Sequence, residues 1–100
     1  MQRTRIKFCG ITRLEDLQVA IDLGVDAMGL VFCPTSPRAI NVQHACMLID
    51  RCGPFITSVG LFMNQDEGTI SSLIEQAPVD MLQFHGNESE QFCRSFGLPY

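Results

Sequence analysis

The chain has 100 residues, of which 46% are hydrophobic and 18% are charged, as is ordinary for one soluble domain. A net charge of −4 without a basic cluster argues against a nucleic-acid or acidic-membrane partner. No apolar run approaches the ~20 residues that cross a bilayer, and the first residues lack the apolar segment of an export signal, so we expect a cytoplasmic protein.

The first part of the chain predicts a strand, a helix and a second strand. Residues 5–11 have the composition of a strand, and Thr12 with Glu15 forms a T-x-x-E capping box that should begin a helix. One side of this helix is apolar, with Leu14, Leu17, Ala20 and Ile21. Gly24 should end the helix, and residues 27–32 are an apolar run of strand length.

The same order repeats through the rest of the chain. Residues 33–40 contain two prolines and should form a loop, after which Asn41 should cap a helix that runs to Cys52. The remaining expected elements are a strand at 56–63, a polar loop at 64–68, a helix at 69–77, a strand at 81–85, and a helix that an Asn87-x-x-Glu90 cap begins and Gly97 ends.

Apolar strands that alternate with amphipathic helices indicate an α/β fold, with a parallel sheet covered by helices. Strands begin about every 25 residues, so eight units would take about 200 residues, the low end of a (β/α)8 barrel. The pattern therefore predicts either the first four βα units of such a barrel or a small open sheet. In the barrel, residues 98–100 would approach a fifth strand.

Strand periodicity separates the side chains of the first predicted strand. Ile6 and Phe8 share the face expected to meet the helices, so Lys7 and Cys9 point to the opposite, inner face. An inward lysine requires polar surroundings, and its charge would favour the thiolate form of Cys9.

Other polar side chains follow later strands. Gln83 and His85 should point to the same side as Cys9, and Arg38 lies in the loop after the second strand. A buried thiol, a capping histidine and a solvated loop arginine are the ordinary explanations of Cys9, His85 and Arg38 taken singly. Their common position at the carboxyl ends of parallel strands, where such folds place their chemistry, favours one site.

Five cysteines (Cys9, Cys33, Cys46, Cys52 and Cys93) form no C-x-x-C pair. The odd number and the spacing favour free thiols in a reducing compartment and argue against a structural zinc site.

The segments KFCGITRLEDLQVAIDLGVDAMGLVF, SPRAI, VGLF and LQFHGNE, in this order, resemble the phosphoribosylanthranilate isomerase family of tryptophan biosynthesis. The resemblance implies a (β/α)8 barrel of about twice this length, with residues 1–100 as the N-terminal half of its single domain. It also implies an Amadori rearrangement of N-(5-phosphoribosyl)anthranilate to 1-(2-carboxyphenylamino)-1-deoxyribulose 5-phosphate, without a metal or organic cofactor.

The resemblance assigns roles to the residues of these motifs. Cys9 would be the general base, and Arg38 would pair with the anthranilate carboxylate of the small-molecule substrate. His85 and Gln83 would line the pocket, and Lys7 would tune Cys9. The family's general acid and its phosphate-binding loops belong to later strands.

Two other interpretations remain open at this point. The first is a non-catalytic half-barrel that associates with another half through its open strand edges. The second is a flavodoxin-like domain, although the segment after the first strand is poor in the glycines of a phosphate-binding loop.

Overall fold

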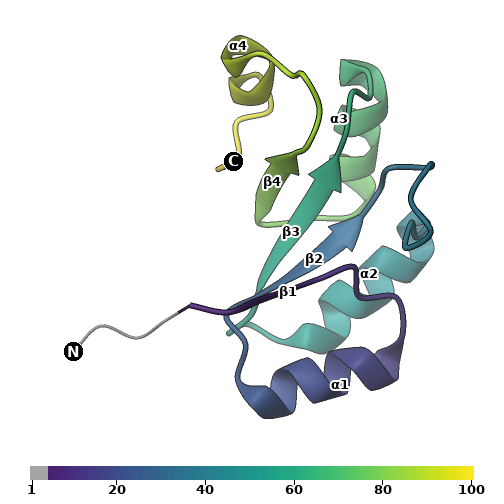
Figure 1. Cartoon of the computed structure of the whole chain (residues 1–100), viewed down its shortest axis with the longest axis vertical. Helices are drawn as coiled ribbons and strands as arrows, with labels where there is room; N and C mark the ends of the chain where they lie inside the picture. Colours follow the sequence, from purple (N-terminus) through teal and green to yellow (C-terminus); the bar gives the residue numbers. More distant parts are fainter. Residues whose placement is uncertain (1–4) are drawn as a thin grey trace.

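The computed structural model describes residues 5–100, and in it four strands alternate with four helices (Figure 1). The first four residues, on which part of the expectation of no export signal rests, lie outside the described residues. The elements are β1 (Lys7–Cys9), α1 (Leu14–Leu23), β2 (Ala27–Val31), α2 (Val42–Cys52), β3 (Thr57–Phe62), α3 (Glu67–Gln76), β4 (Met81–Phe84) and α4 (Glu90–Arg94). None of the helices within residues 5–100 has the length and apolar character needed to span a membrane.

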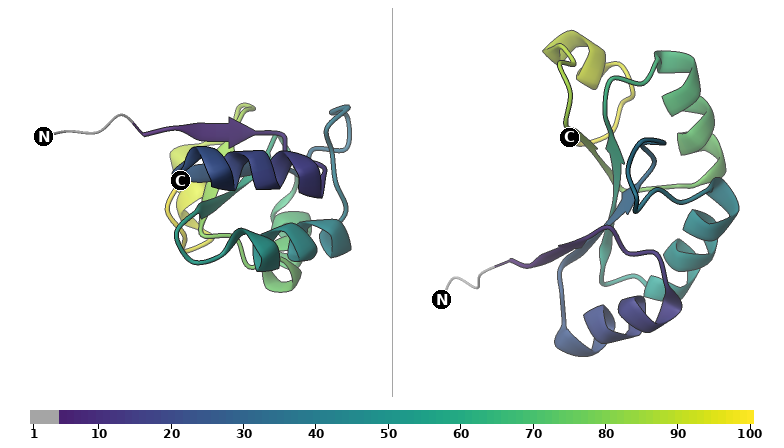
Figure 2. Two further views of the ribbon diagram at one scale, coloured as in Figure 1. Left: turned by 90° about the horizontal axis from the view of Figure 1, so that it is seen from below. Right: turned by 45° about the vertical axis from the view of Figure 1, so that its right-hand side comes forward.

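The four strands form one parallel sheet in the order β1-β2-β3-β4. Parallel neighbours in sequential order require right-handed crossovers that place the connecting helices on one side of the sheet. Figure 2 shows α1, α2 and α3 as an arc along one side of the strands. This arrangement confirms the first four βα units of a (β/α)8 barrel. It excludes the flavodoxin-like alternative, in which the strand order reverses.

The hydrophobic core lies between the sheet and the helices. β2 and β3 are almost wholly buried, which explains why they are nearly continuous apolar runs. The largest fully buried side chains include Leu17, Met28, Leu30, Leu48, Phe62, Ile70 and Leu82. Burial of each of these apolar side chains contributes about 1.5–3 kcal/mol. Phe8 packs against this core as expected, whereas Ile6 is 46% exposed because β1 is an edge strand.

Two of the predicted helix caps are confirmed and two are wrong. Gly24 ends α1 with a φ of 70°, and the Asn41 side chain caps α2 by accepting from the His44 N–H at 2.7 Å. The capping box at Thr12 does not form, because the chain stays extended through Arg13 and α1 begins at Leu14. The other wrong prediction is the cap at Asn87.

The N-cap of α4 is Ser89, whose Oγ accepts from the Phe92 N–H at 3.1 Å. Asn87 lies in the preceding loop, where its backbone N–H donates to Asn64 Oδ1 at 2.8 Å. Two other predicted bounds also differ: α3 begins at Glu67 behind Asp66, ahead of the predicted start at Thr69, and α4 ends at Arg94 before Gly97.

The strands are shorter than predicted, most of all β1, which ends at Cys9 because Gly10 turns the chain with a φ of 74°. The expectation that the outer side of β4 is unpaired is also wrong. The Leu82 N–H donates to the Pro99 carbonyl at 2.8 Å, so residues 98–100 run beside β4, where a fifth strand would start.

Candidate active site

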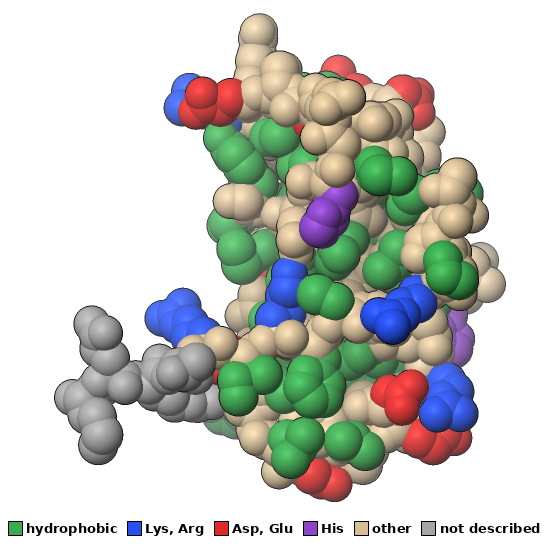
Figure 3. Space-filling view, in the orientation of Figure 1, with side chains coloured by type: hydrophobic (Ala, Val, Ile, Leu, Met, Phe, Trp, Pro, Cys, Tyr) green, Lys and Arg blue, Asp and Glu red, His purple; other side chains and the backbone are tan. Residues whose placement is uncertain are grey.

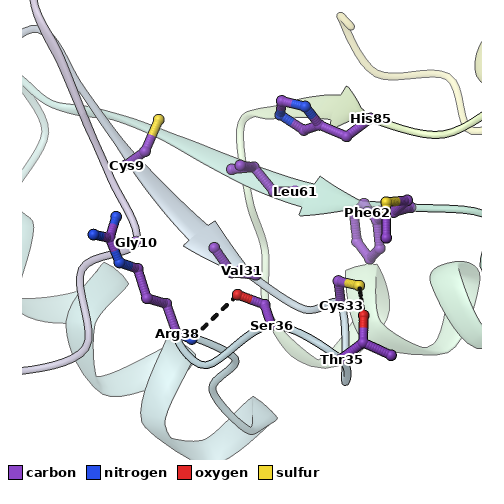
Figure 4. Close-up of a pocket in the computed structure, with 11 residues that line it drawn as sticks. Cys9, Gly10, Val31, Cys33, Thr35, Ser36, Arg38, Leu61, Phe62 and His85 are labelled. Atoms are coloured by element: carbon purple, nitrogen blue, oxygen red, sulfur yellow. Dashed lines mark hydrogen bonds between the residues drawn. The ribbon is translucent and has the colours of Figure 1, made fainter.

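A pocket of about 430 Å³ opens at the carboxyl ends of the strands, and three of the predicted site residues line it. Cys9 is the last residue of β1, Arg38 lies in the loop between β2 and α2, and His85 follows β4. Figure 4 shows the Cys9 thiol and the His85 imidazole over the same face, with Leu61 between them. The fold therefore gathers a thiol, a guanidinium and an imidazole from three separate loops or strand ends.

Arg38 lies directly against Gly10. A β-carbon added to Gly10 would stand 2.4 Å from Arg38 Cδ and 3.1 Å from one guanidinium nitrogen, so the missing side chain makes room for the arginine (Figure 4). Among the residues that the structure describes, no carboxylate forms an ion pair with Arg38. Its charge is thus available to an anionic group in the pocket.

The backbone around Arg38 is fixed by hydrogen bonds. The Arg38 N–H donates to Ser36 Oγ at 3.1 Å, and the Ile40 N–H donates to the Val31 carbonyl at 3.0 Å. Ala39 forms an isolated parallel bridge with Val31. These contacts hold the S-P-R segment beside the end of β2 and aim the arginine across the mouth of the pocket.

Cys9 is held close to β2 by Gly29. The two residues are paired in register, and a β-carbon at Gly29 would stand 3.2 Å from Cys9 Cα. The Gly10 N–H donates to the Gly29 carbonyl at 3.0 Å. The sequence analysis missed Gly29, although a glycine inside an apolar strand is a recognised signal of a close backbone approach.

Lys7 and Gln83 do not line the pocket that holds Cys9. They lie in a neighbouring hollow of about 370 Å³ nearer the amino ends of the strands. Lys7 Nζ donates to Gln83 Oε1, and Gln83 Nε2 lies 2.9 Å from His85 Nε2. The structure thus gives Lys7 a bond to Gln83, and its influence on Cys9 stays a prediction.

The surface over the strands mixes polar and apolar groups. In Figure 3, a histidine and several basic side chains lie among hydrophobic side chains on this face. Lys7, Cys9 and His85 are all exposed, so the inner face of the sheet is open at these residues.

A second thiol, Cys33, lines the same pocket and was not singled out from the sequence. Its Sγ lies 3.1 Å from Thr35 Oγ1. The Thr35 hydroxyl, followed by the backbone N–H groups of Thr35 and Ser36, lowers the pKa of the Cys33 thiol. All five cysteines carry free thiols.

The loop after β4 is attached to the loop after β3 by Glu88, which the sequence analysis treated as part of a motif only. Its two carboxylate oxygens accept from the backbone N–H groups of Gly86 at 2.8 Å and Asn64 at 2.6 Å. Because Gly86 follows His85 directly, these bonds fix the backbone that carries the imidazole. This role depends on the contact of two loops 24 residues apart, which no local pattern reveals.

Two aspartates at the opposite ends of the strands serve the backbone. Asp26 Oδ2 accepts from the Ile6 N–H at 2.8 Å, and Asp80 Oδ2 accepts from the Ser58 N–H at 2.9 Å. The amino ends of the strands thus serve the stability of the fold, as is usual for parallel barrels. Within residues 5–100, no three His, Cys, Asp or Glu side chains are grouped so that they could hold a metal ion.

Comparison with known proteins gives one consistent result. The sequence model described as N-(5'phosphoribosyl)anthranilate (PRA) isomerase matches residues 6–98. The chain is 47% identical over 100 residues to the N-(5'-phosphoribosyl)anthranilate isomerase of Azotobacter vinelandii, covering all of this chain and 48% of that protein. It is 50% identical over 98 residues to the enzyme of the same name from Nitrosococcus oceani, covering 98% of this chain and 48% of that protein.

A solved structure shows the same similarity in three dimensions. A phosphoribosyl anthranilate isomerase in complex with reduced 1-(o-carboxyphenylamino)-1-deoxyribulose 5-phosphate superposes with a TM-score of 0.89 at 35% identity. The match covers 95% of this chain and 49% of that one. The chain thus spans about half the length of the relatives that it matches.

Proposed function

Because the chain belongs to the N-(5'-phosphoribosyl)anthranilate isomerase family, we propose that the protein converts N-(5-phosphoribosyl)anthranilate to 1-(2-carboxyphenylamino)-1-deoxyribulose 5-phosphate. The observation that carries this proposal is the convergence of Cys9, Arg38 and His85 on one pocket. The solved relative supports it, since that protein is in complex with a reduced form of the proposed product.

The Amadori rearrangement requires a general acid and a general base on opposite sides of the sugar. A general acid protonates the ribose ring oxygen, and the ring opens to a Schiff base. The Cys9 thiolate then removes the proton from C2, which leaves an enolamine that tautomerises to the ketone. No acidic side chain in residues 5–100 is assigned to the first step, because none of the residues that line the pocket is an aspartate or a glutamate.

Arg38 and Gly10 fit the role of substrate capture. The guanidinium is a planar fork of donors that matches a carboxylate, and it lies in the pocket without an acidic partner among the described residues. We assign it to the anthranilate carboxylate.

The domain organisation follows from the same proposal. Residues 1–100 form the N-terminal half of one (β/α)8 domain, and the acid and the phosphate site come from the other half. A biosynthetic role of this kind places the protein in the cytoplasm.

The test is turnover in a complete barrel that carries residues 1–100. Cys9→Ser should abolish most turnover while the substrate still binds, because a serine hydroxyl gives up its proton far less readily than a thiol. Cys46→Ser is the matched control: Cys46 lies on α2, where its thiol donates to the Gln76 carbonyl at 2.9 Å, a bond that serine retains. Kinetics of Cys9→Ser within a factor of a few of the unmutated protein would rule out Cys9 as the base.

A further inference from the structure

A chain of hydrogen bonds crosses the open face of the sheet from β1 to β4. Lys7 Nζ bonds to Gln83 Oε1, and Gln83 Nε2 lies 2.9 Å from His85 Nε2. β1 and β4 are three strand positions apart, which in a flat sheet would separate them by about 14 Å. The curvature of the sheet brings the two edges together, so this contact belongs to the barrel geometry and not to either strand alone.

The chemistry of the three side chains determines the orientation of each. A lysine ammonium has three donors and no acceptor, so only the amide oxygen of Gln83 can face it. The amide NH2 of Gln83 must then face His85, and it can only donate. His85 Nε2 is therefore the acceptor, which in a neutral imidazole places the hydrogen on Nδ1.

We propose that Gln83, oriented by Lys7, is a positioning residue that holds His85 in its Nδ1–H tautomer. Within residues 5–100, Nδ1 of His85 has no hydrogen-bond partner, and the imidazole lines the pocket of Cys9 and Arg38. The tautomer makes His85 a donor towards a ligand there. Resting on the proposed function, the ligand atom is a hydroxyl or carbonyl oxygen of the sugar.

The chain contains an internal reference for determining the tautomer of His85 by experiment. It has two histidines, and His44 Nε2 faces the Thr12 carbonyl, which can only accept. His44 is therefore fixed as the opposite tautomer, with its hydrogen on Nε2. Because His44 is on α2, on the other side of the sheet from Lys7 and Gln83, changes at these two residues should leave it unaltered.

The experiment is ¹⁵N NMR of ring-labelled histidine at pH 8, where histidines are neutral, in a complete barrel that carries residues 1–100. Variants His85→Asn and His44→Asn assign the signals. We expect a hydrogen on Nδ1 of His85 and a bare, pyridine-type Nε2, with the reverse pattern for His44. A hydrogen on Nε2 of His85 in the unmutated protein would overturn the proposal.

Three variants test the hydrogen-bonded chain from Lys7 through Gln83 to His85. In Gln83→Glu both oxygens accept, so Nε2 of His85 should gain a hydrogen; if it stays bare, Gln83 does not control the tautomer. Lys7→Arg keeps a donor towards Gln83 and should keep the Nδ1–H form, whereas Lys7→Met should give a mixture because the amide is free to rotate. Equal histidine spectra for Lys7→Arg and Lys7→Met would show that Lys7 does not orient Gln83.

Kinetics separate this inference from the proposed function. With the isomerase substrate, Gln83→Glu should lower kcat/KM by about tenfold, the effect of one lost hydrogen bond, while His44 remains unchanged in the spectrum. A protein that shows the predicted tautomers but no isomerase activity would refute the proposed function. It would still support the control of the His85 tautomer by Gln83. Isomerase activity in a protein whose His85 carries its hydrogen on Nε2 would refute only the control of the tautomer by Gln83.

Discussion

Arg38 lies across Gly10 so closely that any side chain at position 10 would displace it. A β-carbon there would stand 2.4 Å from Arg38 Cδ, and Gly10 also adopts a φ of 74°, which other residues rarely take. One glycine thus serves both the turn that ends β1 and the placement of the arginine.

Gly10→Ala should therefore weaken both the fold and substrate capture. The left-handed backbone alone costs an alanine roughly 1–2 kcal/mol of stability. Displacement of Arg38 should in addition lower kcat/KM by about tenfold, mainly through KM. Steady-state kinetics and urea unfolding of a complete barrel measure the two effects.

Gly24→Ala is the matched control for this substitution. Gly24 has a φ of 70° but its added β-carbon would meet nothing within 4 Å, and it ends α1 far from the pocket. It should show the loss of stability without the loss of kcat/KM. If both variants lose the same fraction of kcat/KM, the contact between Gly10 and Arg38 does not contribute to substrate capture.

Removal of the guanidinium should act on the same step. Arg38→Ala loses a charge-assisted bond worth on the order of 1.5–3 kcal/mol, which corresponds to a ten- to hundredfold fall in kcat/KM. Arg38→Lys keeps the charge but not the planar fork, so it should recover only part of the loss. An unchanged kcat/KM in Arg38→Ala would make Arg38 an ordinary loop residue.

The thiol of Cys33 should react at lower pH than two other cysteines of the chain. The Thr35 hydroxyl, with nearby backbone N–H groups, lowers the pKa of Cys33, whereas burial, followed by a nearby carboxylate, raises the pKa of both Cys52 and Cys93. Alkylation rates across pH, followed for each cysteine peptide by mass spectrometry, should rise at lower pH for Cys33 than for Cys52 or Cys93. Limited access of the reagent lowers the rate at every pH, whereas the pKa of the thiol sets the pH of the midpoint, so the order of the midpoints is informative.

Thr35→Val tests the cause of that shift. Without the hydroxyl donor the thiolate loses its main stabilising contact, so the pKa of Cys33 should rise and its alkylation midpoint should move to higher pH. Thr35→Ser keeps the hydroxyl and should behave like the unmutated protein. A midpoint unmoved by Thr35→Val would assign the shift to the backbone alone.

The sequence predicted the sheet better than the helix ends, for a physical reason. Strands β2 and β3 are buried on most of their length, and burial imposes apolar runs that are visible without a structure. Helix caps depend on single side chains with competitors nearby. Asn87 and Ser89 are both residue types that favour caps, and the sequence does not show that α4 begins behind Ser89 while the Asn87 N–H bonds to Asn64, 23 residues away.

The candidate site shows the same division. Period two along β1 and β4 was sufficient to place Lys7, Cys9, Gln83 and His85 on one face. Their partners were not predictable, because the bond from Lys7 to Gln83 joins residues 76 positions apart on strands that are not neighbours. The curvature of the sheet creates that contact, and this curvature cannot be predicted from the hydrophobic pattern of the individual strands.

The last prediction concerns residues 1–100 on their own, which should not isomerise the substrate and should associate. They hold the proposed base and the carboxylate partner but no proposed acid, and a base alone does not open the ring efficiently. No hydrogen bond from within residues 5–100 covers the outer side of β1, and the inner face with Cys9 and His85 is exposed. A strand edge of this kind invites pairing with a second copy, whereas residues 98–100 already protect β4 in part. Light scattering and a turnover assay on the purified chain test both statements, with the complete barrel as the control. A monodisperse monomer with cooperative unfolding would contradict the association, and turnover well above background would contradict the need for the second half.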